Sequence, residues 1–329
     1  KSQRSTSGIY KGYARLKMYQ WQNDKALEYI EKAGQLRSTD SDFQKRDLNV
    51  LWARIYLNLN NFEQADFHLN KLCAASENTD DEFHKGMCYY IRAEQYYKLG
   101  ELNKALLESF KVFELTKVFK YHLLRAQVYT LMGEIYGELS DYKVASDFLF
   151  KALKIAEQDG LKPITAEVYN ELAWIYKDQG NYALALEFAA KAQAIREEIK
   201  DERGIAACHN VRGLIYLLQN KFDASISEHT NALVIRQKLK YNEGIAASLY
   251  NMALTYEQIG MLEKALQLQM EALEIDKLIN NKQSLAISYN GIAALCLKLG
   301  KMEQARKALE EVRLLAQETG SRLLLKNYY

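Results

Sequence analysis

Proline is almost absent from this sequence, in which Pro163 is the only one among 329 residues. Proline removes a backbone donor and clashes with the preceding turn of a helix, so a chain without it can be helical nearly throughout. No run of 18 apolar residues occurs, which argues against a transmembrane helix. The first residues, KSQRSTSGIYKGY, lack the apolar centre of a signal peptide. We expect a soluble helical chain, with the cytoplasm favoured over the periplasm.

Cysteine is also scarce. The four cysteines, Cys73, Cys88, Cys208 and Cys296, are spread unevenly, and their spacing resembles no disulfide framework. We expect them to be small, buried, apolar side chains. Cys73, His84 and Cys88 are the one grouping with metal-ligating chemistry, but no fourth ligand accompanies them. The sequence therefore predicts neither a metal nor another cofactor.

Neither sign of charge is in clear excess. The 44 basic and 42 acidic residues give a net charge of +2 and are interleaved along the chain, so the basic patch that nucleic-acid binding needs is missing. The five histidines form no metalloprotease motif, and the sequence holds neither a Gly-rich phosphate loop nor a nucleophile elbow. We expect no nucleic-acid partner and no enzymatic activity within these residues.

What the chain does contain is a repeat. A small residue, followed in most copies by tyrosine three positions later, recurs every 40 residues after a first step of 39, and residues 173–192 are the clearest copy. Small residues recur again 12 and mostly 19 positions further on, a spacing that lets two helices approach closely where they cross. A fixed period of this size is the signature of a repeat architecture. The eight opening residues are Ala14, Ala53, Ala93, Gly133, Ala173, Gly213, Ala253 and Ala293, and those 12 positions later are Ala26, Ala65, Ala105, Ala145, Ala185, Ser225, Ala265 and Ala305.

Between the two helices expected in each copy stands a residue suited to a positive φ. Glycine, and after it asparagine, is what the left-handed cap of a helix C-terminus requires. Ser140 is the exception at this place. The predicted turn residues are Asn60, Gly100, Gly180, Asn220, Gly260 and Gly300.

This order of small residue, tyrosine, glycine or asparagine, and alanines resembles the tetratricopeptide repeat, whose usual unit is about 34 residues long. The resemblance covers nearly the whole chain and implies an all-α fold, a right-handed superhelical solenoid of antiparallel helix pairs. The period of 40 and the missing closing proline depart from the usual pattern. This longer unit is similar to repeats of G-protein-signalling scaffolds and of bacterial regulators and sensor-kinase input domains.

The domain organisation expected from the repeat is a single solenoid over residues 1–329. The C-terminal residues SRLLLKNYY align with the start of a further helix at 321–329, which suggests that the chain is cut from a longer protein. The eight repeats are expected at about 8–40, 47–79, 87–119, 127–159, 167–199, 207–239, 247–279 and 287–319.

The resemblance also implies where a partner binds, because the first helix of each unit lines a concave groove in this family. Residues three before, one after, and four or five after the opening small residue point into that groove. Earlier repeats place Tyr90, Tyr97, Leu131, Glu134 and Glu138 on the same face and make that end more acidic. The candidate partner-binding residues are Asn170, Trp174, Asn210, Leu214, Leu217, Leu218, Tyr250, Asn251, Leu254 and Asn290.

The function expected from this face is binding a protein or peptide without catalysis, as the regulatory or sensory part of a larger signalling protein. The asparagines can pair with a peptide backbone, because an amide both donates and accepts, or can simply be common at this position in the family. The leucines can form a partner site or face the next turn of the solenoid. Two alternatives are a self-associating structural module and the non-catalytic part of an enzyme whose catalytic domain lies outside this chain.

Overall fold

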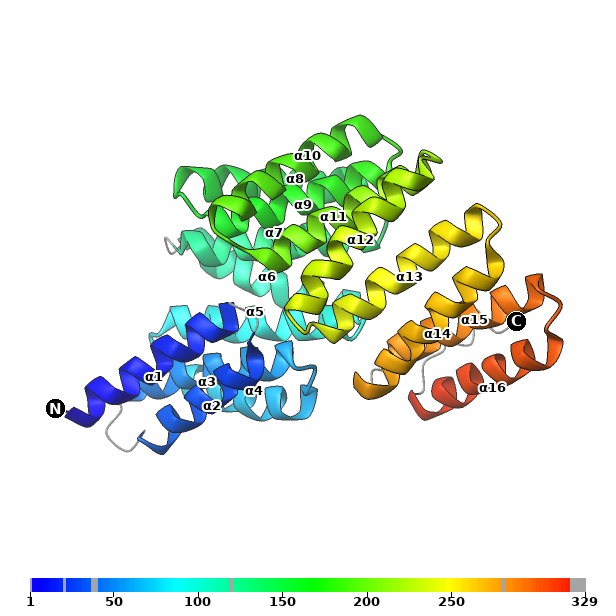
Figure 1. Ribbon diagram of the computed structural model, residues 1–329. Helices are drawn as coiled ribbons and strands as arrows, with labels where there is room; N and C mark the ends of the chain where they lie inside the picture. Colours follow the sequence, from blue (N-terminus) through cyan, green and yellow to red (C-terminus); the bar gives the residue numbers. More distant parts are fainter. Residues whose placement is uncertain are drawn as a thin grey trace. The chain divides into compact units, whose positions relative to one another are not determined.

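The computed structural model describes residues 2–19, 22–36, 41–77, 79–118, 121–279 and 282–319, and all regular structure in these ranges is helical (Figure 1). Consecutive helices pair as antiparallel neighbours, so each repeat predicted from the sequence holds a first and a second helix. The helices are α1 (Ser2–Tyr19), α2 (Asn23–Gln35), α3 (Asp42–Asn58), α4 (Phe62–Glu77), α5 (Glu82–Lys98), α6 (Leu102–Val118), α7 (His122–Glu138), α8 (Tyr142–Gln158), α9 (Lys162–Asp178), α10 (Tyr182–Glu198), α11 (Glu202–Leu218), α12 (Phe222–Lys238), α13 (Asn242–Gln258), α14 (Leu262–Ile279), α15 (Lys282–Lys298) and α16 (Met302–Thr319).

The turns between paired helices confirm the predicted caps. Every predicted glycine or asparagine has a positive φ, between 55° at Asn60 and 80° at Gly260, and Ser140 adopts 60° at the same place. At Gly180 the backbone closes as a helix C-cap does, because the amide of Asn181 donates to the carbonyl of Tyr176 at 2.8 Å. The sequence pattern did not predict the further positive φ values after second helices, which are 65° at Gly160, 57° at Lys200 and 54° at Lys240.

The recurring small residues lie where helices cross, as predicted. Of the opening and second sets named above, the alanines are at most 2% exposed, and Gly133, Gly213 and Ser225 are buried as well. The tyrosine that follows the opening residue packs toward the second helix of its own repeat, as Tyr176 does on Phe188 with ring centroids 5.5 Å apart. The period of 40 therefore reflects the packing of one helix pair.

Overpacking one of these crossings gives a direct test of the assignment. Ala185 on α10 is 0% exposed, so Ala185→Leu is expected to destabilise its repeat by about 1–3 kcal/mol, the usual range for methylenes forced into a packed interior. Hydrogen exchange should rise near α10 and little elsewhere, because contacts in a repeat array are local. Ala190→Leu, an exposed position on the same helix, is the matched control. Equal melting temperatures for the two variants would contradict the assignment.

Two links between repeats are organised by a buried arginine. Arg196 donates to the carbonyl of Gly204 at 2.7 Å, and Arg236 donates to the carbonyl of Gly244 at 2.9 Å and to Ser248 Oγ at 2.7 Å. A Cβ on either glycine would lie within 2.8 Å of the Cδ of its arginine. Gly204 and Gly244, in the links between repeats at 201–204 and 241–244, therefore make room for an arginine side chain that connects one repeat to the next.

The cysteine prediction holds for two residues and is wrong for the other two. Cys208 and Cys296 are free and buried, whereas Cys73 of α4 and Cys88 of α5 form a disulfide with their Cα atoms 5.4 Å apart. The sequence pattern missed the bond because only the antiparallel packing of α4 against α5 brings the two residues together. His84 Nδ1 lies 2.7 Å from Asp81 Oδ2, and no group of metal-binding side chains occurs among the described residues.

The chain divides into two compact units, Lys1–Ile175 (unit 1) and Tyr176–Tyr329 (unit 2), with the boundary inside α9. Each unit is described by itself, and the single solenoid over all eight repeats stays a prediction. The further helix expected at 321–329 lies outside the described residues. Within the described ranges no helix is long and apolar enough to span a membrane.

Candidate functional site

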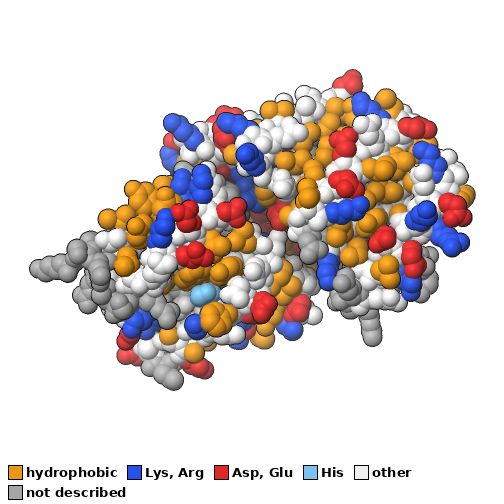
Figure 2. Space-filling view, turned by 60° about the horizontal axis from the view of Figure 1, so that its bottom comes forward, with side chains coloured by type: hydrophobic (Ala, Val, Ile, Leu, Met, Phe, Trp, Pro, Cys, Tyr) orange, Lys and Arg blue, Asp and Glu red, His pale blue; other side chains and the backbone are white. Residues whose placement is uncertain are grey.

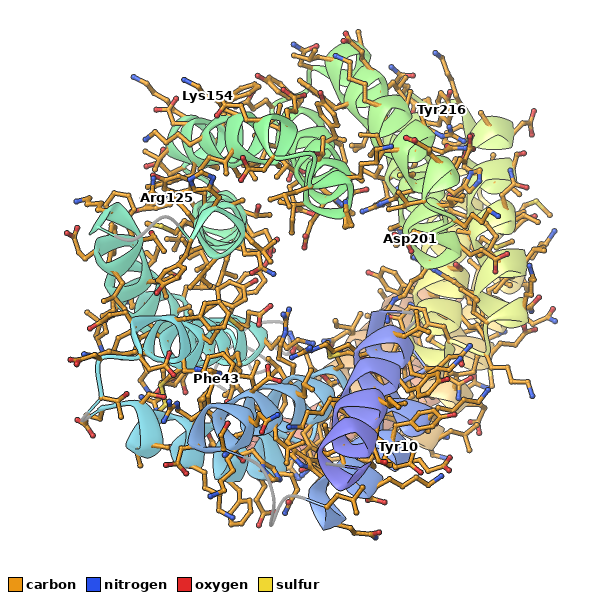
Figure 3. The ribbon with its side chains drawn as sticks, turned by 90° about the vertical axis from the view of Figure 1, so that its left-hand side faces the viewer. Tyr10, Phe43, Arg125, Lys154, Asp201 and Tyr216 are labelled. Atoms are coloured by element: carbon orange, nitrogen blue, oxygen red, sulfur yellow. A yellow bond between two sulfur atoms is a disulfide. The ribbon has the colours of Figure 1, made fainter. Side chains whose placement is uncertain are left out.

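The first helices of repeats six to eight, α11, α13 and α15, carry most of the predicted groove residues. Leu218 is 50% exposed, and Leu214, Leu217, Tyr250, Leu254 and Asn290 are partly exposed. In Figure 3, Asp201 and Tyr216 mark the two ends of α11. The surface in Figure 2 intersperses apolar side chains with charges of both signs. The predicted groove residues on these three helices are apolar, aromatic or amide side chains, and Arg212, Glu257 and Lys298 on the same helices are charged.

The asparagines do not all reach this surface. Asn251 is 8% exposed, and its amide nitrogen donates to Asn210 Oδ1 at 2.7 Å, joining α13 to α11. The Asn251 amide therefore bridges two repeats, and little of this side chain is accessible to a partner. Asn210 remains partly exposed.

Three predicted residues come together at one cavity between α13, α14 and α15, helices that run side by side in Figure 1. They are Tyr250, Leu254 and Asn290. The cavity has a volume of about 330 Å³, at the lower end of the range for small-ligand sites. Its other lining residues are Ala253, Glu257, Gln269, Ile287, Gly291, Ala294 and Leu295.

One ion pair stands at this cavity. Glu257 Oε1 lies 2.7 Å from Nζ of Lys298; the Glu257 side chain is 16% exposed and the Lys298 side chain 55% exposed. Burial raises the pKa of Tyr250, and the charge of Glu257 raises it further. Tyr250 therefore stays a neutral phenol here, and the negative charge of Glu257 already has a cationic partner.

The groove assignment missed Gln269, Ile287 and Gly291, all of which line the cavity. Gln269 belongs to a second helix, for which the resemblance implied no groove role. A signal was nevertheless present in the sequence. Position 269 falls 16 residues after the opening small residue, where three other repeats carry leucine and the remaining four carry isoleucine, serine, alanine and histidine, so Gln269 is the one amide at this position. The leucines are Leu69, Leu149 and Leu309.

A separate polar cluster joins α10, α11 and α12. Arg212 donates to Glu228 Oε2 at 2.7 Å and to Gln193 Oε1 at 2.6 Å, and His209 Nδ1 also lies 2.7 Å from Glu228. Burial opposes ionisation of Glu228, but the hydrogen bonds from His209 and Arg212 lower its pKa overall. All four side chains are engaged with one another, so this cluster serves to hold the three helices together.

In unit 1 the first helices carry carboxylates. Burial raises the pKa of Glu134 on α7 well above its usual range, and Glu171 and Glu167 on α9 raise it further. Arg54 Nη2 lies 3.7 Å from Glu94 Oε1. The acidic character predicted for these repeats is present, and Glu134 holds its proton at pH values where an exposed glutamate is ionised.

The two predicted groove residues of unit 1, Asn170 and Trp174, lie on α9. Asn170 is only 5% exposed, and its amide nitrogen lies 3.3 Å from Glu171 Oε1; Trp174 is partly exposed. Tyr90 and Leu131, expected on the same face, are 6% and 4% exposed. Asn170, Tyr90 and Leu131 therefore mostly fill the spaces between helices, whereas Trp174 keeps an accessible surface.

Antiparallel helix pairs repeated at a constant period define a helical-repeat protein. The comparison with family models agrees: residues 124–198 and 202–277 match one Tetratricopeptide repeat model, and residues 286–317 match another. Together the matches cover more than half of the chain, which therefore belongs to the tetratricopeptide repeat family. No curated protein matches the sequence.

Solved structures share the fold at low sequence identity. A Rap protein complexed with Competence and Sporulation Factor is 12% identical with a TM-score of 0.70, over 98% of this chain and 94% of that one. NprR in complex with its cognate peptide NprX is 17% identical with a TM-score of 0.60, over 88% and 82%. Aspartyl phosphate phosphatase F from Bacillus subtilis is 17% identical with a TM-score of 0.64, over 89% and 75%.

Proposed function

We propose that this chain binds a protein or peptide without catalysis, and that the first-helix face of unit 2 is the principal binding surface. The observation that carries the proposal is the cavity between α13, α14 and α15, where Tyr250, Leu254 and Asn290 meet. It is concave and combines apolar walls with a few polar groups, the usual composition of a ligand site. On α11, Leu218 is exposed and Leu214 partly exposed, so apolar side chains are accessible on this first helix as well.

The wider role proposed is the regulatory or sensory part of a larger signalling protein. Two structural neighbours are themselves complexes, one with Competence and Sporulation Factor and one with a cognate peptide. At identities of 12% and 17% to this chain, these neighbours support the proposal through the shared fold. The distribution of apolar and amide groups on α11, α13 and α15 supplies the support specific to this chain.

A charge placed within this surface should abolish binding. Leu214→Glu would bury an unpaired carboxylate against the partner, which is costly, while folding should be kept because the side chain is already partly exposed. The matched control is Val234→Glu, which adds the same charge at a 59% exposed position on α12. A displayed library of random peptides, selected on the immobilised wild-type chain, supplies the ligands for both variants.

We expect the selected peptides to bind wild type and Val234→Glu equally and to lose binding to Leu214→Glu. Equal binding to all three proteins would show that the face of α11 is not the site. A sharp fall in the melting temperature of Leu214→Glu would instead show that Leu214 supports the fold. Failure to select any peptide, together with a dimeric or larger mass in solution, would favour the self-associating module.

A further inference from the structure

Gln269 on α14 is a buried amide without a hydrogen-bond partner for its oxygen. The residue is 1% exposed, lines the cavity of α13–α15, and Oε1 is unpartnered. An unsatisfied buried acceptor carries a desolvation penalty, and such groups are rare enough to need a reason. Leucine fits the same place at Leu69, Leu149 and Leu309, which are buried or mostly buried. A glutamine kept where leucine packs well indicates a role beyond stability.

The opposite side of the cavity is shaped to admit this amide. A Cβ on Gly291 would lie 1.9 Å from Nε2 of Gln269, so a larger residue at 291 would collide with the glutamine. The equivalent positions of the two preceding repeats hold Asn251 and Val211. The space left by Gly291 therefore lets the Gln269 amide lie at the wall of the cavity.

The other walls of the cavity are apolar, and the charge there is balanced. Leu254, Ile287 and Leu295 line the cavity beside Tyr250. Among the described residues of the lining, Glu257 is the one carboxylate, and it is already paired with Lys298 at 2.7 Å. A cationic side chain entering the cavity would be desolvated next to Lys298, with only a shared counter-charge. The site therefore suits a neutral occupant.

From these features we infer that the cavity takes a tryptophan side chain of the bound peptide, with the indole N–H donating to Gln269 Oε1. The inference rests on the function proposed above. Indole offers a large apolar body and a single donor, which match the apolar walls and the unpartnered acceptor. Rotation of the amide about its last bond exchanges Oε1 and Nε2, and would bring the acceptor to the place beside Gly291 that Nε2 holds. Phenylalanine would leave the acceptor unpartnered, and arginine would bring a charge.

Three blocked tripeptides test this assignment by titration calorimetry. They are N-acetyl-Ala-Trp-Ala-amide, the same peptide with 1-methyltryptophan, and the same peptide with arginine. We expect wild type to bind the tryptophan peptide about tenfold more tightly than its methylated analogue, which has lost one hydrogen bond to a buried acceptor. Gln269→Leu, which restores the leucine of other repeats, should bind both at the affinity of the methylated analogue and melt no lower than wild type.

A blocking variant fixes the location. Ala294 lines the cavity and is exposed, so Ala294→Trp should fill the space from a position that tolerates a large residue and should abolish peptide binding. Equal affinity of wild type for the tryptophan and methylated peptides, tightest binding of the arginine peptide, or no binding of any peptide would each overturn the inference. These outcomes leave the wider proposal standing if library peptides still distinguish Leu214→Glu from Val234→Glu.

Discussion

Reduction of the Cys73–Cys88 disulfide is expected to destabilise helices α4 and α5 by about 3 kcal/mol, the value that chain entropy predicts for a closed loop of about 15 residues. The bond connects the second helix of one repeat to the first helix of the next. Cys88 is 3% exposed and Cys73 partly exposed, and both pack within the apolar cluster around Leu69, Leu72 and Ile91. Without the cross-link, the unfolded state of this segment regains the conformations that the loop now excludes.

Hydrogen exchange with and without a thiol reductant measures this effect locally. Protection should fall in α4 and α5, and hardly change in α11, where the buried Cys208 is already free. Protein unfolded without reductant should show two reactive thiols, those of Cys208 and Cys296. A variant carrying Cys73→Ser and Cys88→Ser should exchange like the reduced wild type and not respond to reductant. Four reactive thiols before reduction, or unchanged exchange after it, would contradict the expectation.

The architecture could be predicted because the same pattern of small and turn-forming residues recurs in most repeats. The period of 40, the buried alanines and the positive φ of Asn60 and Gly180 all follow from residue size and backbone freedom, which are local properties. The disulfide does not follow from such properties. Nothing in the repeat pattern at Cys73 or Cys88 indicates a disulfide. Only the packing of the two helices shows that their Cα atoms come within 5.4 Å of each other.

The site was predicted less completely than the fold for a related reason. The offsets from the opening small residue place Asn210 and Asn251 at neighbouring positions of adjacent repeats. Whether their amides face a partner or each other depends on tertiary geometry. In the structure the two side chains form a hydrogen bond of 2.7 Å. These offsets also cover only residues of the first helices. Gln269 comes from a second helix and reaches the cavity through the space left by Gly291. The cavity therefore depends on the tertiary packing of α13, α14 and α15, which first-helix positions alone do not predict.

His229, which stands at the same repeat position as Gln269, is expected to contribute to the response of stability to acid. His229 occupies the position that Leu149 holds two repeats earlier, is 0% exposed, and has no partner at either ring nitrogen. It packs against Gly213, where a Cβ would lie 2.6 Å from its Cε1, just as Leu149 packs against Gly133. Burial lowers the pKa of His229 to about 4, with Arg236 lowering it further and Glu228 opposing. The folded protein therefore holds this imidazole neutral.

The sign of the resulting pH dependence follows from which state binds the proton. Between about pH 6.5, the ordinary pKa of histidine, and about pH 4, the unfolded chain protonates this residue and the folded chain does not. Stability is therefore fully present above the unfolded pKa and is lost as the pH falls toward the folded one. A difference of about 2.5 pKa units corresponds to about 3 kcal/mol at the acid end of this window.

His229→Leu isolates this contribution, because leucine at 229 reproduces the packing of Leu149 on Gly133. Carboxylates that titrate near pH 4 are common to both proteins, so their effect cancels in the difference between wild type and variant. Urea unfolding followed from pH 7 to pH 4 should show the variant gaining up to about 3 kcal/mol over wild type as the solution is acidified, with no pH-dependent difference above pH 7. Parallel curves across the whole range would show that His229 takes up its proton as easily in the folded chain as in the unfolded one, and that its burial does not hold it neutral.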